Sequence, residues 1–209
     1  MARKTKEDTQ LTIDAILDAA ESVIFKKGMS YTTMADIADA ANVSRGAIYG
    51  HYKNKVEVAT AMATRALNTI KIIEKQDDET CLQYLYRLGL QYLHFSIDPG
   101  SVQRVFLILY IRDDDTEELI AIRQAWENAH FLRVKYWISE AILKNELAAN
   151  TDSHLAALYL QTILDGIFSA LFWCNYCPDN KWETAEKLYQ IGFETLKTTK
   201  QFEQLQVGT

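Results

Sequence analysis

The stretch from Thr32 to Lys55 constrains the fold more than any other part of this chain, because it contains the signals of two short helices and the turn between them. Thr33 followed by Asp36 is the pattern of a capping box, in which each side chain accepts a hydrogen bond from the other residue's backbone N–H. Apolar residues then recur at the spacing of one helical face, at Met34, Ile37, Ala38 and Ala41. This pattern predicts a short helix that begins at Thr32 or Thr33.

A second short helix is predicted directly after a tight turn at Asn42 and Val43. Asn42 tolerates the left-handed conformation that ends a helix, and Ser44 is a favoured N-cap for the next one. In that helix the sequence leaves a polar and aromatic face outward, consisting of Arg45, Gly46 and Tyr49, and turns Ala47 and Ile48 inward. With a further helix beginning near Lys55, this layout predicts a helix-turn-helix whose second helix enters the DNA major groove.

The rest of the chain is also predicted to be helical. Only 2 Pro and 8 Gly occur in 209 residues and 48% of the residues are apolar, which favours long helices. Apolar periodicity and turn residues place the other helices at 9–27, from 55 to about 70, and at 80–97, 101–112, 116–148, 152–174 and 182–198. We therefore expect an all-α fold of about nine helices, with a three-helix DNA-binding domain over 1–55 and a helical ligand-binding and dimerisation bundle over 56–209.

The charge distribution separates the same two parts. The net charge is −6, yet residues 1–55 carry 8 Lys/Arg against 7 Asp/Glu, so the acidic excess lies in the remainder. Basic side chains cluster where phosphates would lie, at Arg3, Lys4, Lys6, Arg45, Lys53 and Lys55. Three cysteines fit a reducing compartment, and we find no signal peptide and no apolar run of roughly 18 residues. A cytoplasmic protein without a membrane partner is expected.

A resemblance to a known family adds to these predictions. Residues 10–60 resemble the DNA-binding domain of the TetR family of transcriptional repressors, through Thr32-Thr33 and through Tyr49-Gly50-His51-Tyr52-Lys53-Asn54-Lys55. The region after residue 80 is similar in length and helix pattern to the AcrR-like branch, which represses multidrug efflux pumps. The resemblance implies a homodimer that binds a palindromic double-stranded operator and is released by a small lipophilic or cationic inducer. Gly50 departs from that branch, which usually has Trp there.

The predicted DNA-binding residues follow from position and chemistry. Arg45, at the start of the recognition helix, can reach a guanine edge, while Tyr49 and His51 suit phosphate or a thymine methyl. Thr33 and Lys55 lie at helix N-termini, which favour phosphate. The complete predicted set is Thr33, Ser44, Arg45, Gly46, Tyr49, His51 and Lys55. Thr32 and Tyr52 fit a cap and a core residue better than contacts, and His51 fits either role.

Two apolar helices predict the dimer interface. The helix at 152–174 is apolar nearly all round, so it must be covered on more than one side, and the helix at 182–198 carries a second apolar stripe. Two such helices from each chain would form a four-helix isologous interface. The candidate residues are Leu160, Ile163, Ile167, Leu171, Leu188 and Tyr189. The alternative is a monomer that buries both helices internally.

Aromatic residues interspersed with polar groups predict a ligand pocket in the same region. An apolar cavity with a few hydrogen-bonding groups suits flat, lipophilic or cationic compounds, and the polar groups include His130 and Gln161. The candidate ligand-binding residues are Leu67, His94, Phe106, Tyr110, Asn128, Phe168 and Phe172. The alternative is that these aromatic side chains only fill the core.

Other arrangements of reactive residues predict no enzyme, cofactor or metal. Cys174 and Cys177 form a C-x-x-C without a second pair, Asp113-Asp114-Asp115 reads as a solvated loop, and the histidines lack metal-ligand spacing. We find no nucleophile–base pair. Two alternatives to the ligand-responsive repressor stay open: a redox-sensing regulator that uses Cys174 and Cys177, and an interaction protein whose helix-turn-helix binds no DNA.

Overall fold

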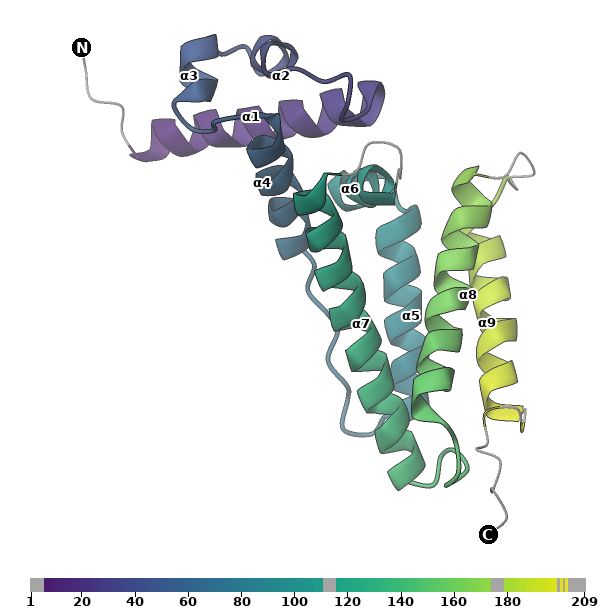
Figure 1. Cartoon of the computed structure of the whole chain (residues 1–209). Coiled ribbons are helices and arrows are strands. Elements are labelled where there is room, and N and C mark those ends of the chain that lie inside the picture. Colours follow the sequence, from purple (N-terminus) through teal and green to yellow (C-terminus); the bar gives the residue numbers. More distant parts are fainter. Residues whose placement is uncertain (1–5, 111–115, 174–178, 199, 201, 203–209) are drawn as a thin grey trace. The chain divides into compact units, whose positions relative to one another are not determined.

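A computed structural model of the chain describes residues 6–110, 116–173, 179–198, 200 and 202. Within these residues it contains nine α-helices joined by turns, which confirms the all-α prediction (Figure 1). Their bounds are α1 Lys6–Lys27, α2 Met34–Ala40, α3 Arg45–Tyr49, α4 Lys55–Asn68, α5 Cys81–Ile97, α6 Ser101–Tyr110, α7 Glu117–Leu143, α8 Ser153–Trp173 and α9 Lys181–Thr198.

The chain forms two compact units. The first contains the residues up to Lys71 together with Pro99–Ala125, and the second contains Ile72–Asp98 together with the residues from Trp126 onward. The first unit thus holds α4 and α6 in addition to the three N-terminal helices. Compactness and function need not divide a chain at the same residue, so the functional boundary at residue 55 stays a prediction.

The first unit has a core built around α1. One face of α1 is buried together with residues of α2, α3 and α4, and the fully buried side chains include Ile16, Ile24, Ile37, Ile48 and Met62. Glu21 of α1 is also buried, and its carboxylate accepts hydrogen bonds from Ser101 and from Nε of Arg104, at 2.6 Å for the latter. A buried carboxylate is tolerated when it is paired, and here both of its partners belong to α6. The contact therefore joins α6 to α1.

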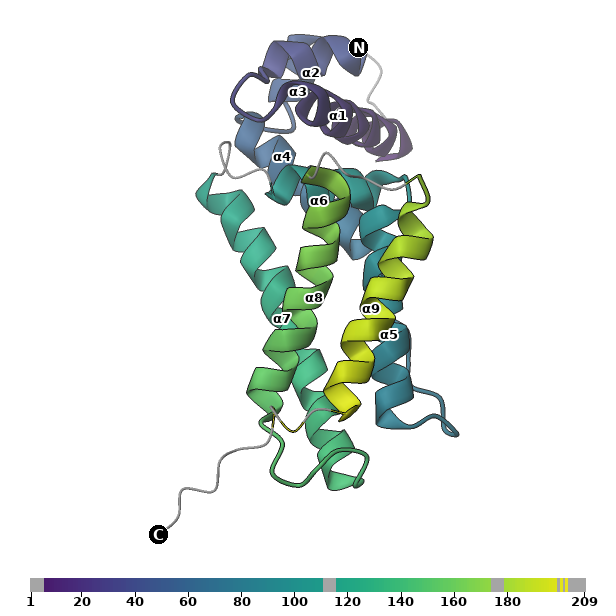
Figure 2. The ribbon, with the colours of Figure 1, turned by 90° about the vertical axis from the view of Figure 1, so that its right-hand side faces the viewer.

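The second unit is a helical bundle of α5, α8, α9 and the part of α7 after Ala125 (Figure 2). By length and composition alone, Ser153–Phe172 of α8 could cross a membrane. In the structure, however, α8 is a core helix: Leu160, Leu164 and Ile167 are buried against α5 and α9. The apolar character of α8 therefore has an explanation inside the bundle.

The packing of α9 on α5 depends on one close approach. The Tyr189 hydroxyl donates a hydrogen bond to the carbonyl oxygen of Leu85 at 3.2 Å, and its ring lies over Gly89. Tyr189 is only 1% exposed, so this is an interior contact. Burial raises the pKa of the Tyr189 phenol, which keeps the hydroxyl protonated as a donor.

The end of α7 differs from the prediction. The helix was expected to run to residue 148, but it ends at Leu143 because Asn145 adopts a left-handed conformation with φ of 57°. The turn that follows directs the Glu146 carboxylate to the start of α5, where it accepts hydrogen bonds from the backbone N–H groups of Cys81 and Leu82, both at 2.9 Å. The carboxylate thus caps a helix that is distant in sequence.

Candidate nucleic-acid interface and ligand site

The start of α2 has the predicted cap. Oγ1 of Thr33 accepts a hydrogen bond from the Asp36 N–H at 3.1 Å, and the Thr33 N–H donates to the Asp36 carboxylate at 3.0 Å. Hydrogen bonds from Lys27 and then Thr33 lower the pKa of Asp36 to about 2. The carboxylate is therefore ionised at neutral pH and holds α2 in place.

The recognition helix α3 also has the predicted geometry. Asn42 has a φ of 53°, and Oγ of Ser44 accepts a hydrogen bond from the Ala47 N–H at 3.1 Å. Ile48 is fully buried, whereas Arg45, Gly46 and Tyr49 are exposed. The Arg45 guanidinium has no ion pair with any other described residue, so its charge and donors are available to a ligand.

The signature residues after α3 have different environments. Tyr52 is half-buried against the core of the first unit, as predicted, and burial raises the pKa of its phenol. His51 is also half-buried. The Lys55 ammonium donates hydrogen bonds to the carbonyl oxygens of Met29 and Ser30, at 2.8 and 3.0 Å. These hydrogen bonds connect the loop before α2 to the start of α4. The spacing of residues in the sequence did not predict this structural role of Lys55.

Two further exposed residues of the first unit lie outside the predicted contact set, although Lys53 was among the basic side chains expected where phosphates would lie. Tyr31, in the loop before α2, is 80% exposed, and Lys53 has a side chain that is 88% exposed. In the sequence, Tyr31 belongs neither to the apolar stripe of α1 nor to that of α2. This was the sequence signal that its side chain faces solvent. Both residues are candidates for contacts with a polyanion.

The predicted ligand-binding residues are divided between the two units. Leu67, Phe106 and Tyr110 belong to the first, whereas His94, Asn128, Phe168 and Phe172 belong to the second. His94 is exposed, with its ring stacked on Trp182 at 3.7 Å and Nδ1 2.9 Å from the Asp98 carboxylate. Asn128 is exposed as well, while Phe106 and Phe168 are buried. The ligand-binding set stays a prediction, and its two polar members lie at the surface.

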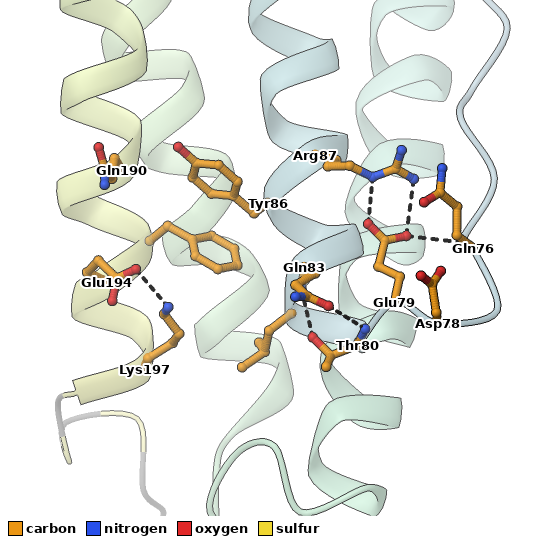
Figure 3. A pocket seen from close by; sticks show the side chains of 12 residues that line it. Gln76, Asp78, Glu79, Thr80, Gln83, Tyr86, Arg87, Gln190, Glu194 and Lys197 are labelled. Atoms are coloured by element: carbon orange, nitrogen blue, oxygen red, sulfur yellow. Dashed lines mark hydrogen bonds and ion pairs between the residues drawn. The ribbon is translucent and has the colours of Figure 1, made fainter.

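Among the described residues, three surface grooves of substantial volume are lined by residues other than those of the predicted ligand-binding set. One of about 660 Å³ lies between the start of α5 and the end of α9 (Figure 3), and its lining includes the aromatic rings of Tyr86 and Phe193. Arg87 and Glu79 form a two-point ion pair on one wall, at 2.5 and 3.1 Å. Another groove of about 1000 Å³ follows α4, and a third of about 550 Å³ lies beside Glu21.

The predicted dimer residues are mostly inside the protomer. Leu160, Ile167, Leu171 and Tyr189 are at most 5% exposed, and Ile163 is half-buried. Only Leu188, at 44%, is exposed. The apolar periodicity of the sequence correctly identified α8 and α9 as apolar helices. It did not distinguish the face of each helix that packs in the protomer core from the face that is exposed. The exposed large apolar residues of α8 and α9 are Leu155, Leu158, Leu188 and Ile191.

Comparison with known proteins identifies the family. Residues 16–62 match the family model of bacterial regulatory proteins of the tetR family. The chain is 30% identical to the transcriptional regulator TtgR of Pseudomonas putida over 174 residues, which cover 80% of this chain and 83% of TtgR. The chain belongs to the TetR family. It is thus a DNA-binding transcriptional regulator, and the all-α, helix-turn-helix prediction agrees with this membership.

Solved structures of TetR-family repressors have the same fold over nearly the whole chain. The structure of MexZ from Pseudomonas aeruginosa, a key repressor responsible for antibiotic resistance, is 41% identical and superposes with a TM-score of 0.85, covering 94% of this chain and 100% of MexZ. NalD from the same organism, the secondary repressor of the MexAB-OprM multidrug efflux pump, is 27% identical, with a TM-score of 0.73 and coverage of 90% and 97%.

The redox alternative gains no support from these findings. The relatives named above are TetR-family regulators and repressors, and Cys174 and Cys177 lie outside the described residues, as do Asp113-Asp114-Asp115, Arg3 and Lys4. Among the residues that the structure describes, no cluster of three metal-ligating side chains is found. These findings support a ligand-responsive DNA-binding repressor.

One buried side chain of the second unit predicts a pH dependence of stability. His130 is 4% exposed, and burial, followed by the charge of Arg133, lowers its pKa to about 4. An unfolded histidine has a pKa of about 6.5. At pH values between this pKa and that of folded His130, the unfolded chain binds a proton at the imidazole and the folded chain does not. The free energy of unfolding therefore falls as the pH falls. We expect a loss of about 3 kcal/mol in the free energy of unfolding between pH 7 and pH 4 from this residue.

The measurement is urea denaturation from pH 7 to pH 4 for the wild-type protein and for His130→Gln. The difference between the two free energies of unfolding should shrink as the pH falls, because the variant lacks the titrating group. A difference that is constant over this range would contradict the neutral, buried state of His130.

Proposed function

We propose that this TetR-family protein is a cytoplasmic homodimer that represses a multidrug efflux operon by binding a palindromic operator, and that a small lipophilic or cationic inducer releases it. The observation that carries the proposal is the 41% identity to MexZ over 94% of the chain, together with a capped α3 whose Arg45 has no ion pair within the described part of the protein. NalD, another relative, represses a multidrug efflux pump. The absence of enzymatic activity stays a prediction.

DNA recognition rests on the exposed face of α3. Arg45 follows the Ser44 cap directly and can give two hydrogen bonds to a guanine edge. Tyr49, which is 56% exposed, and Lys53 extend the same region and suit phosphate contacts. Gly46 leaves open space around its backbone, since a side chain there would meet only the Ser44 oxygen at 3.9 Å. A DNA backbone or base edge can thus approach closely.

The first test replaces Arg45 with alanine. Operator affinity should fall by roughly 1–3 kcal/mol, because a two-point base contact is lost, while binding to random DNA should barely change. Fluorescence anisotropy with both DNAs at fixed salt measures this difference. Lys53→Ala is the matched control and should weaken both complexes equally. An equal loss on both DNAs for Arg45→Ala would show that Arg45 contacts only phosphate.

The dimer is proposed to form through the outer faces of α8 and α9. Leu155 and Leu158 of α8 and Leu188 and Ile191 of α9 are 44–66% exposed, and each pair is three residues apart on its helix. Neighbouring exposed apolar residues on two adjacent helices are typical of an isologous interface. Two recognition helices related by two-fold symmetry would then meet the two halves of a palindromic operator.

Induction requires that the inducer bind the DNA-free conformation more tightly than the operator-bound conformation. A coupling of roughly 1–3 kcal/mol, which is typical of allostery, changes operator affinity about 5–150-fold. Within the first unit, the buried contact of Glu21 with Ser101 and Arg104 links α6 to the α1 helix of the DNA-binding region. A displacement of α6 would therefore act directly on α1.

A further inference from the structure

The turn over residues 28–32, between α1 and α2, leaves a large aromatic side chain in solvent. Tyr31 is 80% exposed, and within the described residues its hydroxyl has no hydrogen-bond partner. The residues around it are buried, since Met29 is 3% exposed and Thr32 is 1% exposed. A tyrosine side chain can bury roughly 150–250 Å² against a partner. Its exposure on an otherwise well-packed turn therefore requires an explanation.

Hydrogen bonds within the turn hold it in one conformation. Gly28 ends α1 with a φ of 81°, and the Thr32 hydroxyl donates to the Gly28 carbonyl oxygen at 2.7 Å. The Thr32 N–H donates to the Met29 carbonyl oxygen at 3.3 Å, and the Met29 side chain packs in the core of the first unit. The backbone is thus fixed on both sides of Tyr31.

The Lys55 ammonium adds a connection from outside the turn. It donates to the carbonyl oxygens of Met29 and Ser30, the two residues directly before Tyr31. An ammonium has three N–H donors, so these two hydrogen bonds leave one donor for any other partner. The orientation of the peptide groups that lead into Tyr31 therefore depends on Lys55.

The charge near the turn indicates the kind of partner that would cover Tyr31. The last turn of α1 carries Lys26 and Lys27, and the Lys53 side chain, just before α4, is 88% exposed. Asp36, a carboxylate close to the turn in sequence, is paired with Lys27 at 2.7 Å. A basic region suits a polyanion, and a tyrosine hydroxyl can donate to a phosphate oxygen. The turn belongs to the same compact unit as α3.

We propose that Tyr31 contacts the phosphate backbone of the operator and that Lys55 is the positioning residue that holds Tyr31 in place. The hydroxyl donates to a phosphate oxygen, and the ammonium keeps the turn in the conformation that presents it. A preformed turn favours binding, because little conformational freedom is lost. The inference rests on the proposed function, since it adds a contact to the same DNA interface. It gives Lys55 a different role from the phosphate contact expected at the start of α4.

The test measures DNA affinity by fluorescence anisotropy over a series of salt concentrations. The probe is a duplex selected from a random-sequence library by the full-length protein. Tyr31→Phe should weaken binding roughly tenfold, because a hydrogen bond to a charged acceptor is lost. The slope of log affinity against log salt should not change, because tyrosine is neutral. Tyr136→Phe makes the same change on an exposed tyrosine of α7 and should bind like the wild type.

Lys55→Met separates positioning from phosphate contact. It should weaken binding with an unchanged salt slope, and it should cause little further loss in a Tyr31→Phe protein, because both changes remove the same contact. Lys55→Arg, which keeps the charge and the donors, should recover most of the affinity. Lys53→Met removes an exposed lysine and should lower the slope by about 1.8, since a homodimer loses two phosphate contacts.

Three results would overturn the inference: wild-type affinity of Tyr31→Phe, additive losses for Tyr31→Phe and Lys55→Met, or a salt slope lowered by about 1.8 in Lys55→Met. The last would make Lys55 a phosphate contact. Because the Tyr31 side chain is exposed, Tyr31→Phe tests the contact even if Lys55→Met loosens the fold. A selection that recovers no duplex would refute DNA binding itself, so a failure of the repressor function is distinguishable from a failure of this contact.

Discussion

Gly89→Ala is expected to lower the free energy of unfolding by roughly 2–6 kcal/mol, which combines overpacking with the loss of a buried hydrogen bond. A β-carbon at this position of α5 would overlap the Tyr189 hydroxyl and ring atoms. Tyr189 cannot move aside easily, because it is 1% exposed and its ring packs on Tyr86 at 5.4 Å. Displacing it would also break its hydrogen bond to the Leu85 carbonyl oxygen.

Two other glycines of the second unit provide graded controls for urea denaturation monitored by circular dichroism. A β-carbon at Gly192 would meet the end of the flexible Ile163 side chain, which can rotate away, so Gly192→Ala should cost about 1 kcal/mol. At Gly166 nothing lies within 4 Å. Gly166→Ala in the middle of α8 should therefore stabilise the protein by roughly 0.5–1 kcal/mol.

The order of the three stabilities is the decisive result. If Gly89→Ala were as stable as Gly166→Ala, Tyr189 would have another arrangement available, and the close approach of α9 to α5 would not depend on this glycine. The experiment thus tests a contact that no sequence pattern within α5 or α9 could reveal. The sequence alone does not show whether a helical glycine is required by a side chain packed against it from another helix.

Local signals made the DNA-binding region predictable. The Thr33–Asp36 capping box, the left-handed Asn42 and the Ser44 cap each involve atoms within three residues of one another, so residue types and spacing determine them. The same holds for Gly28, which ends α1 with a φ of 81°. These signals also correctly identified the exposed face that carries Arg45 and Tyr49.

Contacts between distant segments could not be predicted in this way. The Glu146 carboxylate caps α5 across 65 residues, and the Lys55 ammonium binds the Met29 carbonyl oxygen across 26. The Asp165 carboxylate of α8 accepts a hydrogen bond from the Tyr92 hydroxyl of α5 across 73 residues. In each case the two partners of a polar contact are brought together only by the tertiary fold.

Leu188→Glu is expected to dissociate the dimer and to lower operator affinity by roughly 10²–10⁴-fold, because a monomer loses the advantage of two linked half-site contacts. The exposed leucine lies on α9, which packs against α8, so a carboxylate there would be desolvated in the proposed interface. In the monomer the same side chain faces water, and the free energy of unfolding of the protomer should change by less than about 0.5 kcal/mol.

The choice of residue matters because apolar character alone does not identify an interface. Ile167 is 5% exposed within the protomer, so a charge there would unfold the bundle and abolish DNA binding for a trivial reason. Leu132 of α7 offers a matched control: it is 53% exposed against 44% for Leu188, and Leu132→Glu makes the same change on a helix outside the proposed interface. Sedimentation velocity should show a monomer for Leu188→Glu and a dimer for Leu132→Glu. The reverse result would move the interface to α7, and with it the geometry by which two recognition helices meet one operator.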